Sequence, residues 1–269
     1  ASLKIAKAIN GEIISTDSRQ IYREMTISTD ALPVEQQEGI PHHMLEIRNP
    51  DQTLTLAEFK DLALEIIAEI YQRGHIPMLV GGTGLYVSAI TEGYQVPRIP
   101  PNPQLRMQLE EEDNETLHQK LTAFDPETAK NIHQNNRRYV IRALEINAAG
   151  RPKIDQKEES PFQTLMIGID RPRPEIYQRI EARVDEQIKG GLIEEVKALL
   201  EKGYDPALPS MSSLGVKEII PYIKGEQTLE AVSATLKQNT RNYAKRQMTW
   251  SRRYNHVLWL TPEQIIASL

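Results

Sequence analysis

The stretch PMLVGGTGLY, residues 77–86, decides the fold class of this 269-residue chain. Its first four residues predict a short buried strand, its glycines predict a tight turn, and a helix is expected from about Leu85. Upstream, Leu56–Arg73 carries apolar residues at helical spacing, and Glu12–Ser15 has the pattern of another short strand. Strand, helix, strand, glycine turn and helix in this order are typical of an α/β fold with a parallel sheet.

The composition is that of an ordinary globular protein, and it excludes several classes of function. Hydrophobic residues make up 39% of the chain and charged residues 26%, so disorder and rod-like folds are poor fits. The absence of cysteine rules out disulfides, cysteine-ligated zinc, iron–sulfur clusters and a thiol nucleophile. No run of 18 apolar residues occurs, so we predict no membrane-spanning helix.

The rest of the chain predicts a helical insertion in this core. Four prolines between residues 97 and 103 mark a boundary, and residues 104–149 have the pattern of helices only. Within them, Asp125-Pro126 is a helix-start signal, because proline is favoured at the first helical position. We therefore divide the chain into a core, 1–98 and 146–269, and an insertion, 99–145. The core is expected to continue with strands at Thr164–Ile169 and Val257–Leu260 and with helices at about 174–189, 192–202 and 228–253.

Two polar residues follow different predicted strands. Asp17 comes just after the strand at 12–15, and Thr83 lies in the glycine turn after the strand at 77–80. Ligands of open α/β sheets bind at the carboxyl ends of the strands, where a carboxylate can accept a proton. We therefore expect both side chains at one edge of the sheet. Two alternatives stay open: Asp17 can be a turn or capping residue, and the glycines can form either an anion site or only a tight turn.

Basic residues are unevenly distributed along a chain whose net charge is −5. Residues 231–262 contain six Lys or Arg and no Asp or Glu. Three of the six recur at every fourth position: Lys237, Arg241 and Lys245. Arg138 and Arg142 are also four apart, hence on one helix face. Such stripes indicate contact with phosphate or nucleic acid. The alternative is a solvated face with ion pairing, for Arg142 with Glu145.

Two adjacent histidines, His42 and His43, lie in a loop-rich stretch at 33–52. On an extended segment their side chains point to opposite faces, and the usual spacing of metal ligands is absent around them. We therefore predict that they pack or hydrogen-bond locally, and we expect no metal-binding side chains.

Six segments occur in one order along the chain: GEIISTDSRQIYREM (11–25), IPHHMLEIRNP (40–50), AEFKDLALEII (57–67), MLVGGTGLYVSAITEG (78–93), HQNNRRYVIRALEIN (133–147) and NYAKRQMTWSRR (242–253). Together they resemble the tRNA dimethylallyltransferases, also called isopentenyl-tRNA transferases. Each is weak alone, but together they extend the resemblance over essentially the whole chain. The resemblance implies a P-loop NTPase-like α/β core with an all-helical insertion. Without cysteine the chain lacks the zinc finger of many eukaryotic members, so it resembles a bacterial-type or organellar enzyme.

The resemblance also implies a reaction. Members of this family transfer a dimethylallyl group from dimethylallyl diphosphate to N6 of the adenosine 3′ of the anticodon, in tRNAs that read codons starting with U. The implied cofactor is Mg²⁺, which would stabilise the leaving diphosphate. The implied setting is the cytoplasm, with a monomeric enzyme that binds the tRNA anticodon loop and no membrane.

Roles carried over residue by residue make Asp17 the general base on N6 and place Thr83 beside the base as a second catalytic residue. Arg183 would bind the diphosphate of the donor. The residues implied to contact tRNA are Ser18, Arg19, Gln20, Thr83, Arg106, Arg138, Arg142, Lys245 and Arg246. The insertion, 99–145, would supply part of this tRNA surface.

Three alternative functions remain open. An adenylate isopentenyltransferase would act on free adenine nucleotides, but the helical insertion and the basic stripes favour tRNA. A P-loop-like kinase would need the phosphate loop GxTxxGK[ST], which the family also carries and the printed sequence lacks. A non-catalytic RNA-binding remnant would fit a chain without that loop. We expect further residues before Ala1, and we expect little or no transferase activity from a chain that truly began there.

Overall fold

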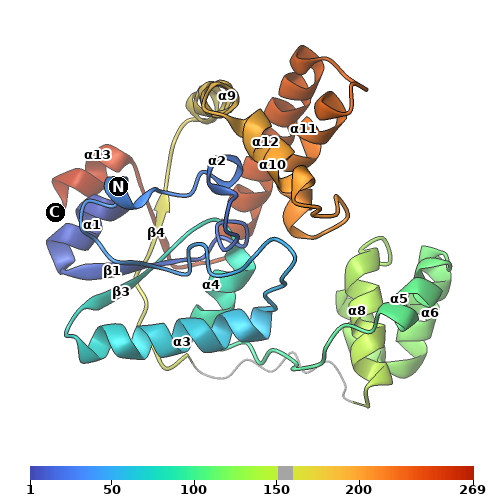
Figure 1. Ribbon diagram of the computed structural model, residues 1–269. Helices are drawn as coiled ribbons and strands as arrows, with labels where there is room; N and C mark the ends of the chain where they lie inside the picture. The colour runs from blue at the N-terminus through green and yellow to red at the C-terminus, as the bar shows by residue number, and fades with distance from the viewer. Residues whose placement is uncertain (151–159) are drawn as a thin grey trace. The chain divides into compact units, whose positions relative to one another are not determined.

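The computed structural model describes residues 1–150 and 160–269, which form two compact units. Residues Ala1–Thr91 and Phe162–Leu269 make the first unit, and Glu92–Pro161 makes the second (Figure 1). The predicted insertion, 99–145, lies within the second unit. Each unit has a hydrophobic core of its own.

The first unit alternates strands and helices at its start and is mainly helical towards its end. Its strands are β1 (Gly11–Ser15), β2 (His42–His43), β3 (Ile76–Val80), β4 (Met166–Ile169) and β5 (Val257–Leu260). Its α-helices are α1 (Ser2–Ile9), α2 (Thr26–Thr29), α3 (Leu56–Gln72), α4 (Gly84–Thr91), α9 (Arg173–Lys189), α10 (Leu192–Glu201), α11 (Val216–Ile223), α12 (Leu229–Ser251) and α13 (Pro262–Ala267). Short 3-10 helices lie at Val34–Gln36 and Ser210–Ser212. None of the helices in the described ranges is long and apolar enough to cross a membrane.

Every strand pair in the described part of the chain is parallel, which confirms the predicted α/β class. β1 is the middle strand of a three-stranded sheet of order β2-β1-β3, and β4 pairs with β5 in a second sheet. The register joins Gly11 to Ile76 and Ser15 to Val80. Because β1 and β3 run in the same direction, their carboxyl ends meet at one edge, and the loops that follow them start side by side.

Helix α3 packs against β1, β3 and α4, and its sequence specifies both its start and its buried face. Thr55 and Glu58 form a capping box at its first turn, as each side chain bonds the backbone N–H of the other residue. The ring of Phe59 is fully buried and stacks on Tyr86 of α4, with ring centroids 3.8 Å apart. Such a pair contributes about 0.5–1.5 kcal/mol beyond the burial of its surface. This contact fixes α4, which begins in the glycine turn.

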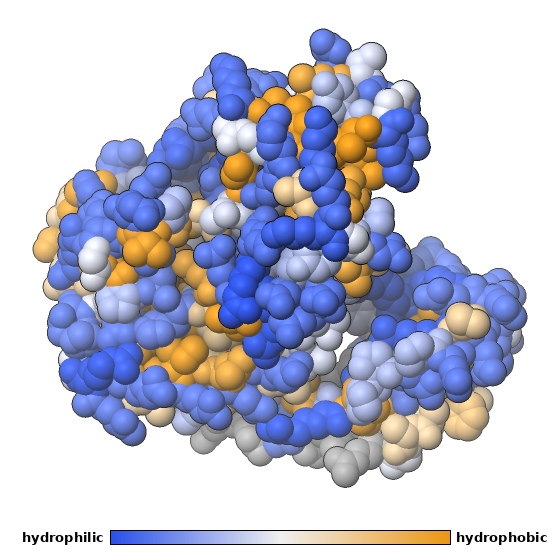
Figure 2. Space-filling view, in the orientation of Figure 1, coloured by the Kyte–Doolittle hydropathy of each residue, from blue (hydrophilic) through white to orange (hydrophobic). Residues whose placement is uncertain are grey.

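Helices α9 to α12 share a second hydrophobic core, to which Met25 at the start of α2 also contributes. Glu195 of α10 accepts hydrogen bonds from the backbone N–H groups of Ile27 (2.7 Å) and Ser28 (3.0 Å). Gln187 of α9 donates to the carbonyl of Ile27 at 2.7 Å. These bonds tie the segment that follows β1 to the helical part. Figure 2 shows hydrophobic residues reaching the surface among α10–α12 and beside α3 on a largely hydrophilic face.

The second unit consists, in its described residues, of helices and connecting loops. The helices are α5 (Pro103–Glu110), α6 (Asn114–Phe124), α7 (Pro126–Asn131) and α8 (Arg137–Ala148). The predicted helix start at Asp125-Pro126 is confirmed, because α7 begins at Pro126 and the Asp125 carboxylate accepts the backbone N–H of Thr128 at 3.0 Å. Leu117, Leu121 and Val140 are fully buried at the centre of its core. The sequence-predicted change from mixed to purely helical structure is therefore present.

Candidate active site at the edge of the parallel sheet

The loops after β1 and β3 are joined by backbone hydrogen bonds at the carboxyl edge of the sheet. Thr16 donates its N–H to the carbonyl of Val80 at 2.8 Å, and Thr83 donates its N–H to the carbonyl of Thr16 at 3.1 Å. The ladder between β1 and β3 thus continues into both loops. Asp17 and Thr83, which the sequence placed after different strands, consequently lie in adjoining loops.

The hydroxyl of Thr83 links the two loops through side chains as well. Ser18 donates its backbone N–H to Oγ1 of Thr83 at 3.0 Å, and the Thr83 hydroxyl donates to Oγ of Ser18 at 3.2 Å. Next to this pair, Oδ1 of Asp17 accepts the N–H of Arg19 at 2.8 Å. The loop conformation around Asp17 is therefore held by its own neighbours and by Thr83.

Asp17 is the strongest base candidate at this edge because of its surroundings. Burial raises the pKa of its carboxyl, against the opposing effect of hydrogen bonds from the backbone of Arg19 and Gln20 and of the Arg19 charge. A carboxylate with a raised pKa binds a proton more readily than one in water. The side chain is still partly exposed, so a substrate can reach it.

Gln20 and Arg19, both predicted to contact tRNA, make contacts within the protein. Oε1 of Gln20 accepts from the Ser15 hydroxyl at 3.0 Å, and its Nε2 donates to the carbonyl of Asp30 at 3.1 Å. The Arg19 guanidinium donates to the carbonyl of Pro209 and, at 3.4 Å, to the Ser212 hydroxyl. These bonds anchor the loop after β1 to the α2 region and to the loop before α11.

Arg183, the predicted diphosphate ligand, projects from α9 towards the same region. Its Nη1 lies 3.2 Å from Oδ2 of Asp30, and both side chains are more than half exposed. An exposed ion pair of this kind contributes about 0–1 kcal/mol. The guanidinium can therefore exchange this partner for a phosphate at little cost.

Helix α12 closes over the glycine turn, which the sequence did not predict. A Cβ atom on Gly82 would overlap the side-chain amide of Gln247, and one on Gly84 would overlap the indole of Trp250. The close approach of the Trp250 ring leaves no room for a side chain at position 84, whereas the end of the flexible Gln247 side chain can move away from position 82. The local sequence pattern could not distinguish this packing role of Gly84 from anion binding. Tyr243 lies one turn before Gln247 on α12, and burial raises the pKa of its phenol. Residues 243, 247 and 250 are spaced by four and three positions, which predicts from sequence that they share one face of α12.

The basic stripe of α12 divides into paired and exposed positions. Lys237 binds Asp185 at 2.7 Å and Arg241 binds Glu181 at 2.8 Å, both acids being on α9. Lys245 and Arg246 are exposed. The Arg246 guanidinium lies 5.7 Å from the ring centre of Tyr243. Phosphate contact thus fits the exposed Lys245 and Arg246 better than the paired Lys237 and Arg241.

In the second unit, two of the three arginines predicted to contact tRNA bind a buried carboxylate. Glu145 accepts two bonds from Arg106, both at 2.7 Å, and one from Arg142 at 3.1 Å. The open alternative for Arg142, an ion pair with Glu145, is therefore what the structure has. Arg138 is exposed. It is the member of this group best placed for a phosphate.

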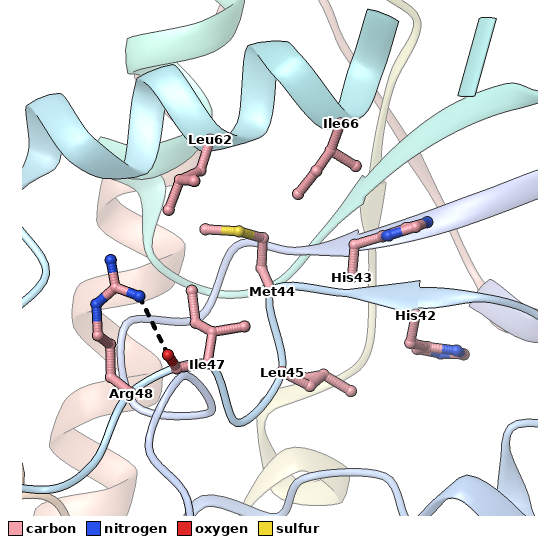
Figure 3. A pocket seen from close by; sticks show the side chains of 8 residues that line it. All are labelled: His42, His43, Met44, Leu45, Ile47, Arg48, Leu62 and Ile66. Atoms are coloured by element: carbon pink, nitrogen blue, oxygen red, sulfur yellow. Dashed lines mark hydrogen bonds between the residues drawn. The ribbon is translucent and has the colours of Figure 1, made fainter. Parts of the chain in front are cut away.

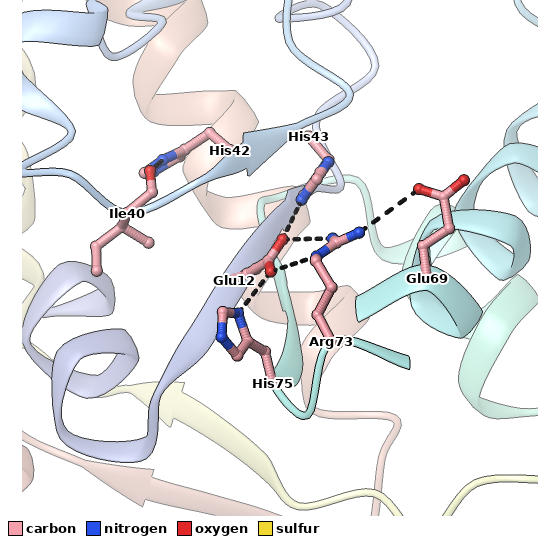
Figure 4. A network of polar contacts seen from close by, with 7 residues as sticks. All are labelled: Glu12, Ile40, His42, His43, Glu69, Arg73 and His75. Carbon is pink, nitrogen blue, oxygen red and sulfur yellow. Dashed lines mark hydrogen bonds and ion pairs between the residues drawn. The ribbon is translucent and has the colours of Figure 1, made fainter. Parts of the chain in front are cut away.

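The two adjacent histidines hydrogen-bond within the protein, as predicted. His42 donates Nδ1–H to the carbonyl of Ile40 at 2.8 Å, and His43 donates Nε2–H to Glu12 at 2.7 Å (Figure 4). Glu12 also accepts from His75 at 2.7 Å and from two nitrogens of Arg73 at 3.0 and 2.8 Å. This network joins β1 and β2 to the end of α3.

A cavity of about 410 Å³ opens beside the histidines, between β2 and α3. Leu62 and Ile66 point from α3 towards Met44 across it (Figure 3). Its other lining residues are His42, His43, Leu45, Ile47 and Arg48. None of the sequence-predicted site residues lines this cavity, so it is distinct from the edge that holds Asp17.

The fold and the site define an α/β protein of the P-loop-like class, with a helical insertion and a partly exposed carboxylate at the edge of its sheet. A family model described as IPP transferase matches residues 20–254. The chain belongs to this family, as the sequence resemblance predicted.

Relatives and solved structures of this family resemble the chain over nearly all of its length. A tRNA dimethylallyltransferase of Chloroflexus aggregans is 46% identical over 265 residues, which cover 96% of this chain and 90% of the relative. The crystal structure of the full-length tRNA isopentenylpyrophosphate transferase from Bacillus halodurans has a TM-score of 0.74 at 40% identity, covering 99% of this chain and 88% of that one. Crystal structures of a eukaryotic dimethylallyltransferase acting on tRNA give a TM-score of 0.79 at 28% identity, and the match covers 97% of this chain and 69% of that one. These likenesses confirm the predicted fold class.

Proposed function

We propose that this chain is a tRNA dimethylallyltransferase, which prenylates N6 of the adenosine 3′ of the anticodon in tRNAs that read codons starting with U. The observation that carries the proposal is the carboxylate of Asp17, half-buried beside Thr83 at the carboxyl edge of the sheet, in a chain of the IPP transferase family. Family membership supports the reaction class, and the raised pKa and partial exposure of Asp17 support its role as the base.

The reaction exchanges one bond for another at the allylic carbon. N6 of adenine attacks this carbon, the bond from carbon to the diphosphate oxygen breaks, and the N6 proton passes to the carboxylate of Asp17. A base with a raised pKa suits this step, because the amino group of adenine is only weakly nucleophilic until its proton is accepted. The adenosine must leave its stack to reach the edge of the sheet, which costs less for a loop nucleotide than for a paired one.

The leaving diphosphate carries the negative charge that develops in this reaction. Arg183 is the proposed ligand, because its exposed pair with Asp30 is weak and a guanidinium binds phosphate oxygens in a bidentate manner. Among residues 1–150 and 160–269, no three side chains of His, Asp or Glu converge in a way that could hold a metal. In our proposal Mg²⁺ would be held largely by the diphosphate oxygens and would offset the negative charge of the leaving group.

Each of the two units is proposed to contribute exposed basic residues to tRNA binding. Lys245 and Arg246 of α12 and Arg138 of α8 are exposed, so their charges can meet phosphates directly. Ser18, Gln20 and Thr83 line the edge where the adenine would lie. Arg106, Arg142 and Arg19 would reach RNA only by giving up bonds within the protein. We propose that the enzyme works as a monomer in the cytoplasm.

A comparison of acceptors tests this proposal. The full-length protein, dimethylallyl diphosphate and Mg²⁺ are incubated with a tRNA that reads a U-starting codon, or with AMP, ADP or ATP. We expect mass spectrometry of the digested tRNA to show one added dimethylallyl group on the adenosine 3′ of the anticodon. Transfer to the free nucleotides alone would identify an adenylate isopentenyltransferase instead. Binding of tRNA without transfer to any acceptor would indicate a non-catalytic RNA-binding protein.

A further inference from the structure

The end of α12 holds the start of α4, the helix that follows the glycine turn. The indole of Trp250 lies so close to Gly84 that a Cβ atom on this glycine would be 2.0 Å from Cδ1 of the ring. Just beyond the helix, Tyr254 donates its N–H to the carbonyl of Ser251 at 3.2 Å, and this turn brings the phenol to the same place. The Tyr254 hydroxyl donates to the carbonyl of Gly84 at 3.2 Å. A ring and a phenol of one segment thus meet the first residue of α4.

The hydroxyl of Tyr254 makes every hydrogen bond that a hydroxyl can make. A hydroxyl has one proton and two acceptor positions. The proton goes to the carbonyl of Gly84, and one acceptor position takes the indole N–H of Trp250 at 3.3 Å. Oγ of Ser88 lies 2.5 Å from the phenol oxygen. Because the phenol proton is already given to Gly84, Ser88 is the donor in this bond.

The phenol therefore binds α4 at two points, one helical turn apart. Gly84 is the first residue of α4, and Ser88 lies four residues later. Ser88 is buried, so water cannot easily replace the phenol as the partner of its hydroxyl. Two bonded points fix the first turn of α4 more firmly than one would.

The first turn of α4 in turn sets the position of Thr83. Thr83 directly precedes Gly84, and its carbonyl accepts the N–H of Tyr86 at 2.9 Å. Its Oγ1 accepts the N–H of Ser18 at 3.0 Å, in the residue after Asp17. A shift of the start of α4 would therefore move Thr83, and with it the loop that carries the candidate base.

We propose that Tyr254 is a positioning residue of the transferase reaction: by holding the first turn of α4, its hydroxyl keeps Thr83 bonded to Ser18. Tyr254 acts through Thr83 and takes no proton from the substrate. Small displacements of positioned groups lower the rate of the bound complex more than they lower binding. The inference rests on the proposed function for its kinetic part, and on the geometry alone for the bonds between Tyr254 and α4.

Kinetics of Tyr254→Phe in the full-length protein test the proposed role, because this change removes the hydroxyl and keeps the ring. We expect kcat with tRNA, measured well below the Tm of each protein, to fall about 3- to 10-fold, with KM for tRNA nearly unchanged. In the Thr83→Val background the same change should alter kcat less than about twofold, because the side-chain link to Ser18 is already gone. Tyr71→Phe, at an exposed tyrosine of α3, is the matched control and should change nothing.

Thermal unfolding tests the bonds themselves, without reference to activity. The shifts in Tm of Tyr254→Phe and Ser88→Ala should be non-additive in the double variant, because the two side chains share a bond. This holds whether or not the wild type transfers dimethylallyl groups. Additive shifts would reject the bond between the phenol and α4.

The kinetic part is overturned by either of two results. An unchanged kcat in Tyr254→Phe, together with a lowered Tm, means that the hydroxyl stabilises the fold and positions nothing. An equal loss of kcat in the wild-type and Thr83→Val backgrounds means that Tyr254 does not act through Thr83. Absence of transfer by the wild type would instead reject the proposed function.

Discussion

Two carboxylates, Glu12 and Asp17, lie five residues apart on and just after the same strand, yet the protein treats them in opposite ways. Glu12 is buried on β1 and accepts hydrogen bonds from Arg73, His43 and His75. The hydrogen bonds from Arg73 have the largest effect on its pKa, which falls from 4.5 to about 2. Asp17 has no such cation bound to it, and burial raises the pKa of its carboxyl above 3.8.

The difference between the two pKa values indicates a structural role for Glu12 and a chemical role for Asp17. The carboxylate of Glu12 joins β1 to β2 and to the end of α3. Because its pKa is lowered by these bonds, it stays ionised and cannot act as a base at neutral pH. Asp17 lies past the last ladder bond and is held by backbone N–H groups rather than by a cation. Its basicity is therefore available to a substrate. Substitutions at the two positions should accordingly separate activity from stability.

The largest expected effect is on turnover in Asp17→Asn. The amide cannot accept the N6 proton, so we expect kcat for dimethylallyl transfer to fall about 10²–10⁴-fold, the usual contribution of a general base. The Kd for tRNA should change little, because the exposed basic residues remain. Steady-state kinetics and a filter-binding titration of the full-length protein measure both. Asp51→Asn, at an exposed aspartate, is the control, and a normal rate in Asp17→Asn would remove Asp17 from the mechanism.

The converse substitution, Glu12→Gln, should affect stability and leave chemistry intact. Removing one partner of a buried ion pair costs about 3–5 kcal/mol. The loss here should be about 2–3 kcal/mol of the free energy of unfolding, because the Arg73 side chain is 43% exposed and can be solvated. Urea unfolding measures this loss. A comparable fall in kcat of the folded variant would show that the two carboxylates are not separated in role.

The pH dependence of stability should have opposite signs at the two positions. The pKa of Glu12 is lowered, so its contribution to stability is complete above pH 4.5 and is lost as the pH falls towards about 2. The pKa of Asp17 is raised, so stability decreases as the pH rises from 3.8 and Asp17 ionises in the folded protein. We expect a shallower loss of Tm below pH 4.5 in Glu12→Gln, and a higher Tm at neutral pH in Asp17→Asn. Parallel Tm profiles for both variants would contradict this assignment of signs.

Much of the edge that holds Asp17 was predictable because its signals are local. The strands at 12–15 and 77–80, the glycine turn and the helix after it are written in consecutive residues, and parallel strands necessarily end at one edge. Asp17 and Thr83 could therefore be placed together without any knowledge of distant contacts. The strand β2 was missed, because two residues are too short to show a periodic pattern.

The rest depends on partners far away in the sequence. Arg73 is 61 residues from Glu12, so no spacing indicates that they meet. From sequence alone, the basic stripe of α12 has the pattern of an exposed phosphate-binding surface. In the structure, Asp185 of α9 pairs with Lys237 of this stripe. The need for glycine at position 84 comes from Trp250, more than 160 residues later. Local patterns predict elements, whereas pairing of charges depends on how the elements pack.

The smallest expected effect is the loss of stability in Arg73→Lys, which changes only the hydrogen bonds between residue 73 and Glu12. Arg73→Lys keeps the positive charge beside Glu12, but an ammonium cannot reproduce the two parallel bonds that the guanidinium makes. We expect a smaller loss in the free energy of unfolding than in Glu12→Gln, because one hydrogen bond is lost while the charge is kept, and no change in kcat. Urea unfolding at pH 7 measures the loss, with Lys237→Arg as a control for exchange of basic residues at a pair outside the network. A loss as large as that of Glu12→Gln would mean that bidentate geometry, rather than charge, gives the network its stability.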